Sequence, residues 1–216
     1  MIKDTAFTLS LIRHGQSEVN AIPDLMGQTA DVPLTEKGKD QATRLRIRFL
    51  RTKEKFNYIY SSPYLRAYDT ALLSIPDPRQ TITLAPPLRE YDAGDWLFGS
   101  RLKLITPQIK AKMDALNHTF LPPNGESVSM VERRASKWLE DEILYRQDAP
   151  YQGEPVNIAC FSHGLTIKAL LHSIIGFDKS FTWKIKIDNT SITKLSFDTQ
   201  AGWKLLCIND CGHLES

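Results

Sequence analysis

Two short polar motifs carry the residues best suited to chemistry in this chain of 216 residues. An Arg-His-Gly motif at 13–15 follows the apolar run 7–12, and a Ser-His-Gly motif at 162–164 follows the apolar run 156–161. A neutral imidazole is a nucleophile near pH 7, and arginine binds phosphate through charge-assisted hydrogen bonds. The two motifs therefore favour chemistry on a phosphoryl group.

Both motifs occupy the position that a ligand site takes in an open α/β sheet. Each apolar run predicts a strand and the residues beyond each motif predict a helix, so that both histidines follow the carboxyl end of a strand. Right-handed crossovers bring such strand ends to one edge of the sheet, and we expect His14 and His163 to meet across one crevice. Gly15 is expected to let the backbone approach the ligand closely.

Two further residues follow predicted strands and complete a candidate pocket. Arg66 lies in the first turn of a helix predicted to start at Pro63 and end near Ser74, with Ser62 as its cap. Glu90 follows a short strand predicted at 81–84. The candidate pocket consists of Arg13, His14, Arg66, Glu90 and His163.

This set suits hydrolysis of a phosphate monoester. Two arginines neutralise the phosphoryl oxygens without a metal, and an imidazole can attack phosphorus to give a phosphohistidine. The departing alkoxide needs a proton, which Glu90 could supply before it takes one from the attacking water. Asp92 and Asp95 lie further into the following loop and are less well placed.

The remaining pattern predicts a single α/β domain over residues 1–216. Thr35 is expected to cap a helix at 36–51, and Gly176 to end a helix that starts at 165. Residues 91–150 are expected to form an insertion that partly caps the sheet. Other predicted elements are a helix at 130–145, capped by Ser127 or Ser129, and strands at 184–197 and 203–208.

Composition limits the class of protein and its partners. The chain carries 27 basic and 25 acidic residues, so we expect neither nucleic acid nor a membrane as partner. The N-terminus lacks a signal-peptide pattern, and three cysteines indicate a reducing compartment, so we expect a cytoplasmic protein. Cys207, Cys211 and His213 are interpreted as structural rather than metal ligands, and the basic stripe of Arg44, Arg48, Arg51 and Lys55 as a solvated helix face.

In sequence, these motifs closely resemble the histidine phosphatase superfamily, the phosphoglycerate-mutase-like group. The resemblance covers nearly the whole chain. Its segments are Leu11-Ile12-Arg13-His14-Gly15-Gln16-Ser17 with Asn20, Pro33-Leu34-Thr35-Glu36-Lys37-Gly38, Ser61-Ser62-Pro63-Tyr64-Leu65-Arg66-Ala67, Leu88-Arg89-Glu90, Gly125-Glu126-Ser127, Phe161-Ser162-His163-Gly164 and Asn189-Thr190-Ser191.

The resemblance implies a three-layer α/β/α sandwich with a mostly parallel central sheet, and a reaction without metal or other cofactor. By position, His14 would be the nucleophile and Glu90 the proton donor. The phosphate pocket would comprise Arg13, Arg66, His163, the side chain of Asn20 and the backbone N–H of Gly164.

Departures from the family pattern favour its phosphatase branch. The acid is followed by Tyr91-Asp92-Ala93-Gly94 rather than by the Arg and Tyr-Gly of the mutases, and Arg133-Arg134 falls inside a predicted helix. We therefore expect a phosphatase that acts on a small phosphorylated metabolite. A mutase that moves phosphate within its substrate, and a phosphohistidine scaffold without turnover, are the alternatives.

Overall fold

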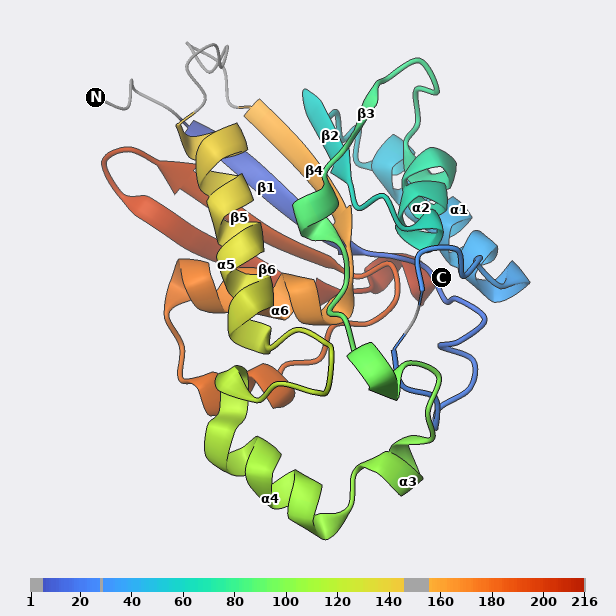
Figure 1. Cartoon of the computed structure of the whole chain (residues 1–216). Helices are drawn as coiled ribbons and strands as arrows, with labels where there is room; N and C mark the ends of the chain where they lie inside the picture. The colour runs from blue at the N-terminus through green and yellow to red at the C-terminus, as the bar shows by residue number, and fades with distance from the viewer. Residues whose placement is uncertain (1–5, 28, 146–155, 216) are drawn as a thin grey trace.

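The computed structural model describes residues 6–27, 29–145 and 156–215 (Figure 1). Residues 1–5, on which the signal-peptide prediction rests, and residues 146–150 of the predicted insertion lie outside this part. One sheet has the strand order β3-β2-β4-β1-β5-β6. Its strands are β1 (Ala6–Arg13), β2 (Tyr58–Ser61), β3 (Ile82–Leu84), β4 (Val156–Ser162), β5 (Ile192–Asp198) and β6 (Gly202–Asp210). The first four strands in this order run parallel, β5 runs antiparallel to β1, and β6 runs antiparallel to β5.

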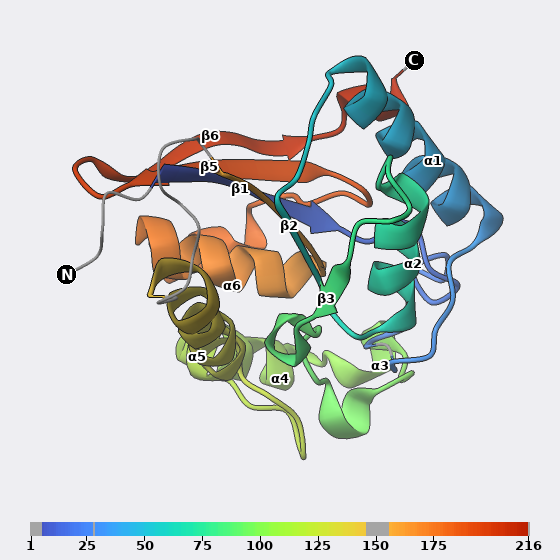
Figure 2. The same ribbon diagram turned by 90° about the horizontal axis from the view of Figure 1, so that it is seen from above.

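Helices cover both faces of the sheet (Figure 2). On one face lie α1 (Glu36–Arg51) and α2 (Leu65–Ser74), and on the other α5 (Val128–Leu139) and α6 (Gly164–Ile175). Short helices α3 (Arg101–Leu104) and α4 (Pro107–Leu116) lie apart from these layers. Single turns complete the chain: η1 (Pro86–Leu88), η2 (Gly94–Trp96), η3 (Asn117–Thr119), the π-helical η4 (Glu140–Leu144), η5 (Lys179–Trp183) and η6 (Gly212–Leu214). The predicted α/β/α class is confirmed.

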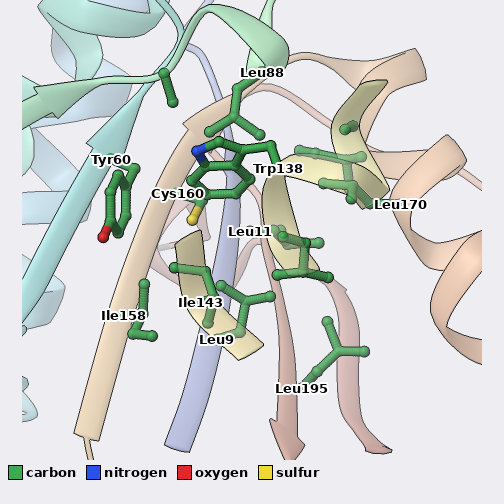
Figure 3. Packing of buried hydrophobic residues seen from close by; sticks show 14 of the residues in the cluster. Leu9, Leu11, Tyr60, Leu88, Trp138, Ile143, Ile158, Cys160, Leu170 and Leu195 are labelled. Carbon is green, nitrogen blue, oxygen red and sulfur yellow. The ribbon is translucent and has the colours of Figure 1, made fainter. Parts of the chain in front are cut away.

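The central strands are buried on both faces because their side chains alternate between two clusters. Leu9 and Leu11 of β1 pack with Trp138 of α5 and Leu170 of α6 (Figure 3). Ile12 points to the opposite face, into the cluster formed with α1 and α2. Such two-sided burial explains the near-continuous apolar runs and holds the carboxyl ends of β1 and β4 in place.

Local signals set several helix ends as predicted. The Thr35 side chain accepts a hydrogen bond from the N–H of Gly38 at 3.0 Å, and α1 spans the predicted residues. Gly176 ends α6 in the left-handed conformation with φ of +75°. Ser127 caps α5 by accepting from the N–H of Met130.

The start of α2 differs from the prediction. The helix begins at Leu65 with Tyr64 as its N-cap, so Pro63 does not occupy its first turn. The Ser62 hydroxyl accepts a hydrogen bond from the N–H of Tyr64 at 3.2 Å and lies 2.8 Å from Nε2 of His163. A distant histidine therefore uses the side chain that local pattern assigned to a cap.

The strand predicted at 184–197 is wrong in its first half. β5 begins at Ile192, and residues 184–191 form a loop that returns to β1. Thr190 has a φ of +56°, and its N–H bonds to the carbonyl oxygen of Arg13 at 3.0 Å. Contacts with the end of β1 override the strand propensity of this segment.

Two surface features follow from charge and length. Arg48 of α1 donates to both carboxylate oxygens of Asp210, at 2.8 and 2.5 Å, so part of the basic stripe holds α1 against the end of β6. Among the described residues, none of the helices combines the length and apolar character needed to cross a membrane.

Residues 91–127 are built differently from the layers. Neither α3 nor α4 contains a buried residue. The segment is joined to the loop after β1 by backbone hydrogen bonds between Met26 and both Phe98 and Gly99. Figure 1 shows α3 and α4 on the side of the molecule toward which β1 and β4 run.

Candidate active site

The two histidine motifs meet as predicted. β1 pairs with β4 in parallel, which places Arg13 opposite Ser162. The N–H of His14 donates to the carbonyl oxygen of Ser162 at 3.0 Å. The His14 and His163 rings then lie 5.1 Å apart, centroid to centroid. Adjacent parallel strands thus join residues separated by most of the chain.

His14 is buried and held in one tautomer. Its Nδ1 lies 2.7 Å from the carbonyl oxygen of Gly15. A carbonyl oxygen can only accept, so Nδ1 carries the proton and Nε2 keeps its lone pair. Burial, together with the charges of Arg66 and Arg13, holds the pKa of His14 well below its usual value. The ring is therefore neutral at pH 7, as a nucleophile must be.

Gly15 has a packing role that the sequence did not show. A Cβ at this position would lie 2.6 Å from the carbonyl oxygen of Gly38 in α1. The N–H of Gly15 bonds to the Thr70 hydroxyl of α2 at 2.9 Å. A close backbone approach at Gly15 is therefore made to α1, in addition to the approach to a ligand that the sequence predicts.

Arg66 is fully buried although only part of its guanidinium is paired. Nη1 donates to the carbonyl oxygen of Thr29 at 2.8 Å, and the guanidinium carbon lies 5.0 Å from the centre of the Tyr64 ring. Nε and Nη2 have no hydrogen-bond partner among the described residues. Burial lowers the pKa of Arg66 to about 10, which leaves the side chain cationic at neutral pH.

Arg13 and His163 show the same partial pairing. Nη1 of Arg13 donates to the carbonyl oxygen of Ile187 at 2.7 Å, while its buried Nε lacks a partner within the described chain. His163 is held at Nε2 by Ser62, and its buried Nδ1 is likewise unpaired. Because the Ser62 hydroxyl already accepts from the Tyr64 N–H, it can donate to Nε2 and leave the proton on Nδ1.

Four buried nitrogens of the candidate pocket thus lack a hydrogen-bond partner among the residues that the structure describes. They are Arg13 Nε, Arg66 Nε, Arg66 Nη2 and His163 Nδ1. A buried donor left unpaired costs about 1–3 kcal/mol, and more when it is charged. A group with several acceptor oxygens and negative charge would satisfy these donors together, which is the description of a phosphoryl group.

The side chain of Glu90, which comes from the loop after η1, lies against the N-terminus of α6. Its Oε1 accepts from the N–H of Tyr91 at 2.9 Å and from the N–H of Thr166 at 3.3 Å. Oε2 accepts from the N–H of Leu165 at 3.4 Å. The charge of Glu90 also acts on Arg13 and Arg66. The carboxyl group is therefore anchored beside both arginines.

Arg134 is a residue whose part in the site was missed from sequence. From α5 it donates to the carbonyl oxygens of Pro87, Arg89 and Glu90 at 2.5, 2.9 and 3.1 Å. It also forms an ion pair with Glu126. Burial alone would raise the pKa of Glu126, but Arg134 and Arg89 hold that pKa below its usual value. The Arg133-Arg134 pair suggested only a comparison with mutases, whereas Arg134 fixes the segment that carries Glu90.

The loop 184–191 supplies another missed contact. Nδ2 of Asn189 donates to the carbonyl oxygen of His14 at 2.9 Å and to Oδ1 of Asn20 at 3.4 Å. Asn20 is thereby oriented next to the nucleophile motif, and it lines the cavity described below. Gly164 begins α6, where the first N–H groups of a helix have no partner within the helix.

A cavity of about 450 Å³ is lined by three of the predicted site residues and by side chains of the segment 91–127, whereas His14, Arg66, His163 and Gly164 do not line it. Arg13, Asn20 and Glu90 belong to its wall. The rest of the wall is mostly apolar: Val19, Ile22, Pro23, Leu25, Met26, Gly27, Tyr91, Ala93, Trp96, Arg101, Ile105, Met113, Leu165 and Trp183. The volume of the cavity and the mostly apolar side chains of its wall suit a small molecule with apolar surface.

Comparison with known proteins establishes the class. The family model of the Histidine phosphatase superfamily (branch 1) matches residues 9–211. The chain therefore belongs to this superfamily, and it is a phosphoric monoester hydrolase. A relative described as "Putative phosphoserine phosphatase 2", from Hydrogenobacter thermophilus, is 34% identical over 88% of this chain and 89% of its own length.

Two further comparisons show the range of the family. A protein described as "Probable phosphoglycerate mutase", from Photorhabdus laumondii subsp. laumondii, is 28% identical over 95% of this chain and 94% of its own length. A mutant phosphoserine phosphatase from Entamoeba histolytica, solved in complex with phosphoserine, superposes with a TM-score of 0.80 at 25% identity. That comparison covers 96% of this chain and 99% of the other.

Proposed function

We propose that the protein hydrolyses the phosphomonoester of a small metabolite through a phosphohistidine on His14. The observation that carries this proposal is a set of four buried nitrogens of Arg13, Arg66 and His163 for which the described part of the chain provides no hydrogen-bond partner. The His163 ring lies 5.1 Å from the His14 ring, and the charges of Arg13 and Arg66 act on this neutral imidazole, whose Nε2 keeps its lone pair. Fixed donors of this kind stabilise the charge on a transferring phosphoryl group.

The reaction has two balanced steps. In the first, Nε2 of His14 forms a bond to phosphorus, the bond to the leaving oxygen breaks, and the protonated carboxyl of Glu90 gives its proton to that oxygen. In the second, Glu90 takes a proton from water, whose oxygen attacks phosphorus and releases the histidine. One carboxyl group therefore serves as acid and then as base.

The cavity wall favours a substrate whose organic part has apolar surface. Trp96, Met113 and Trp183 line the cavity, and Arg101 adds a cation to its wall. Two relatives are phosphoserine phosphatases by description, which supports a small substrate, whereas this wall suits a larger and less polar alcohol. A panel of phosphorylated metabolites that includes aryl phosphates and phosphoserine tests the choice.

Trapping the intermediate tests the mechanism. Enzyme mixed with labelled substrate and quenched in alkali is expected to keep an alkali-stable, acid-labile label in the wild type and to lose it in His14→Ala. His163→Ala, in which the nucleophile is intact, serves as the matched variant. It should still become labelled, but more slowly than the wild type. Label that persists in His14→Ala would show that another residue is the nucleophile.

A mutase is the second candidate because one of the relatives carries that description. The distinction rests on the fate of the phosphoryl group. We expect 3-phosphoglycerate with its bisphosphate primer to be isomerised slowly or not at all, with inorganic phosphate as the product that accumulates. Fast isomerisation that depends on the primer would overturn the phosphatase proposal.

A further inference from the structure

A second group of titratable side chains lies outside the catalytic residues. It consists of His118 on η3, Glu132 on α5 and His172 on α6. Nδ1 of His172 lies 2.9 Å from Oε1 of Glu132, and Nδ1 of His118 lies 3.7 Å from Oε2. The candidate ligand atoms of the three side chains are all within 4.8 Å of one another. None of the three lines the cavity beside His14.

His118 is the buried member of the group. It has no exposed surface, and its Nδ1 has no hydrogen-bond partner among the described residues. Its Nε2 lies 2.7 Å from the hydroxyl of Thr182, which is also buried. The ring is thus held by its far nitrogen while the near nitrogen faces Glu132, an arrangement that second-shell partners give to metal-bound histidines.

The hydrogen bonds within this group leave one buried nitrogen without a partner among the described residues. A hydrogen-bonding role alone would satisfy His172 and leave Nδ1 of His118 unpaired.

We propose that His118, Glu132 and His172 bind a divalent transition metal ion of the zinc type. Two imidazoles and one carboxylate are a common zinc ligand set, whereas Mg²⁺ and Ca²⁺ prefer oxygen ligands alone. The side chains of His172 and Glu132 are 14% and 22% exposed, so water can reach the remaining coordination position. A bound ion would fasten η3, at the end of the segment 91–127, to α5 and α6.

Calorimetric titration of chelator-treated full-length protein with Zn²⁺ tests the proposal. We expect one saturable site per chain and a rise in Tm on binding, because the ion binds the folded state. Co²⁺ should bind at the same stoichiometry with visible absorption bands of a low-symmetry site. Mg²⁺ and Ca²⁺ should leave Tm unchanged, and an equal rise with either of them would overturn the zinc-type assignment.

Variants locate the site. His172→Gln and Glu132→Gln, which change the more accessible ligands, should each weaken Zn²⁺ binding by about 100-fold or more, and Thr182→Val by about tenfold. The double variant Cys207→Ser/Cys211→Ser is the control for binding by thiols and should bind as the wild type does. Circular dichroism and Tm without metal confirm that each variant is folded. Absence of saturable binding to the wild type, or wild-type affinity in His172→Gln, would refute the site.

Discussion

The phosphate end of the site and the outer wall, formed by the cavity beside it, differ in how they are built. At the phosphate end, His14, Arg66 and His163 are at most 1% exposed, and strands and helices of the core position them. The outer wall comes largely from loops and from α3 and α4, which contain no buried residue. In the proposed reaction, the chemistry depends on residues of the core. The choice of substrate depends largely on the segment 91–127, which can vary without disturbing the core.

The two regions also differ in their effect on the free energy of folding. The phosphate end buries charged groups whose donors are in part without a partner within residues 6–27, 29–145 and 156–215, an arrangement that opposes folding in the absence of ligand. The outer wall exposes apolar side chains such as Trp183, which is 55% exposed. Variants at the first region should therefore trade stability against catalysis, and variants at the second should change affinity alone.

The largest effect is expected at Arg66. Arg66→Met should lower kcat/KM by about 10²–10³-fold, as loss of a charge-stabilising donor does, while Tm is unchanged or higher because a buried charge is removed. Steady-state kinetics and thermal denaturation measure both. Arg66→Lys, which keeps the charge without the planar group, is the matched variant and should recover only part of the activity. Near-wild-type kinetics in Arg66→Met would show that the phosphate end does not carry the chemistry and would contradict the distinction between the two regions.

Arg134 tests whether the core positions the acid. Arg134→Gln should lower kcat by about 10–100-fold with a smaller change in KM, because the backbone segment that carries Glu90 is no longer held in place by Arg134. The loss should be smaller for 4-nitrophenyl phosphate, whose leaving oxygen needs little protonation. Equal losses for this substrate and for an alkyl phosphate would show that Arg134 acts otherwise than through Glu90.

The pH dependence follows from the lowered pKa of His14. Protonated His14 cannot attack phosphorus, so activity is lost as pH falls through this pKa, which burial and two arginines keep well below 6.5. The acidic limb of kcat/KM, after allowance for ionisation of the substrate, is therefore expected below pH 6.5. A histidine-dependent limb at or above pH 6.5 would mean that His14 is charged in the free enzyme.

The smallest effect is expected at the outer wall. Trp183→Ala should raise KM for an aryl phosphate by about tenfold and leave kcat nearly unchanged, since an apolar contact contributes to binding throughout the reaction. Phe181→Ala is the control, because Phe181 is 51% exposed and does not line the cavity. A kcat effect at Trp183 that equals the effect at Arg66 would place the wall in the chemistry.

Most of the core could be predicted from local pattern. Apolar runs identified β1 and β4, and Thr35 and Gly176 marked helix ends that the structure confirms. Ser62 shows where such reasoning stops. A serine before proline predicts a helix cap, but nothing local shows that His163 lies against its hydroxyl. The same holds for 184–191, where contact with Arg13 outweighs the strand propensity of the segment.

The helix predicted directly after the first motif is wrong, because residues 14–27 and 29–35 form turns, bends and isolated bridges, and α1 begins only at Glu36. The sequence alone established which residue types follow β1 and β4, because each motif comes directly after its strand. It therefore indicated a phosphoryl site and a fold class. Three properties came from the tertiary structure: His14 is neutral with its proton on Nδ1, four buried nitrogens of Arg13, Arg66 and His163 lack a partner among the described residues, and Arg134 holds the Glu90 segment. These properties depend on burial and on contacts between distant segments, which no local pattern records.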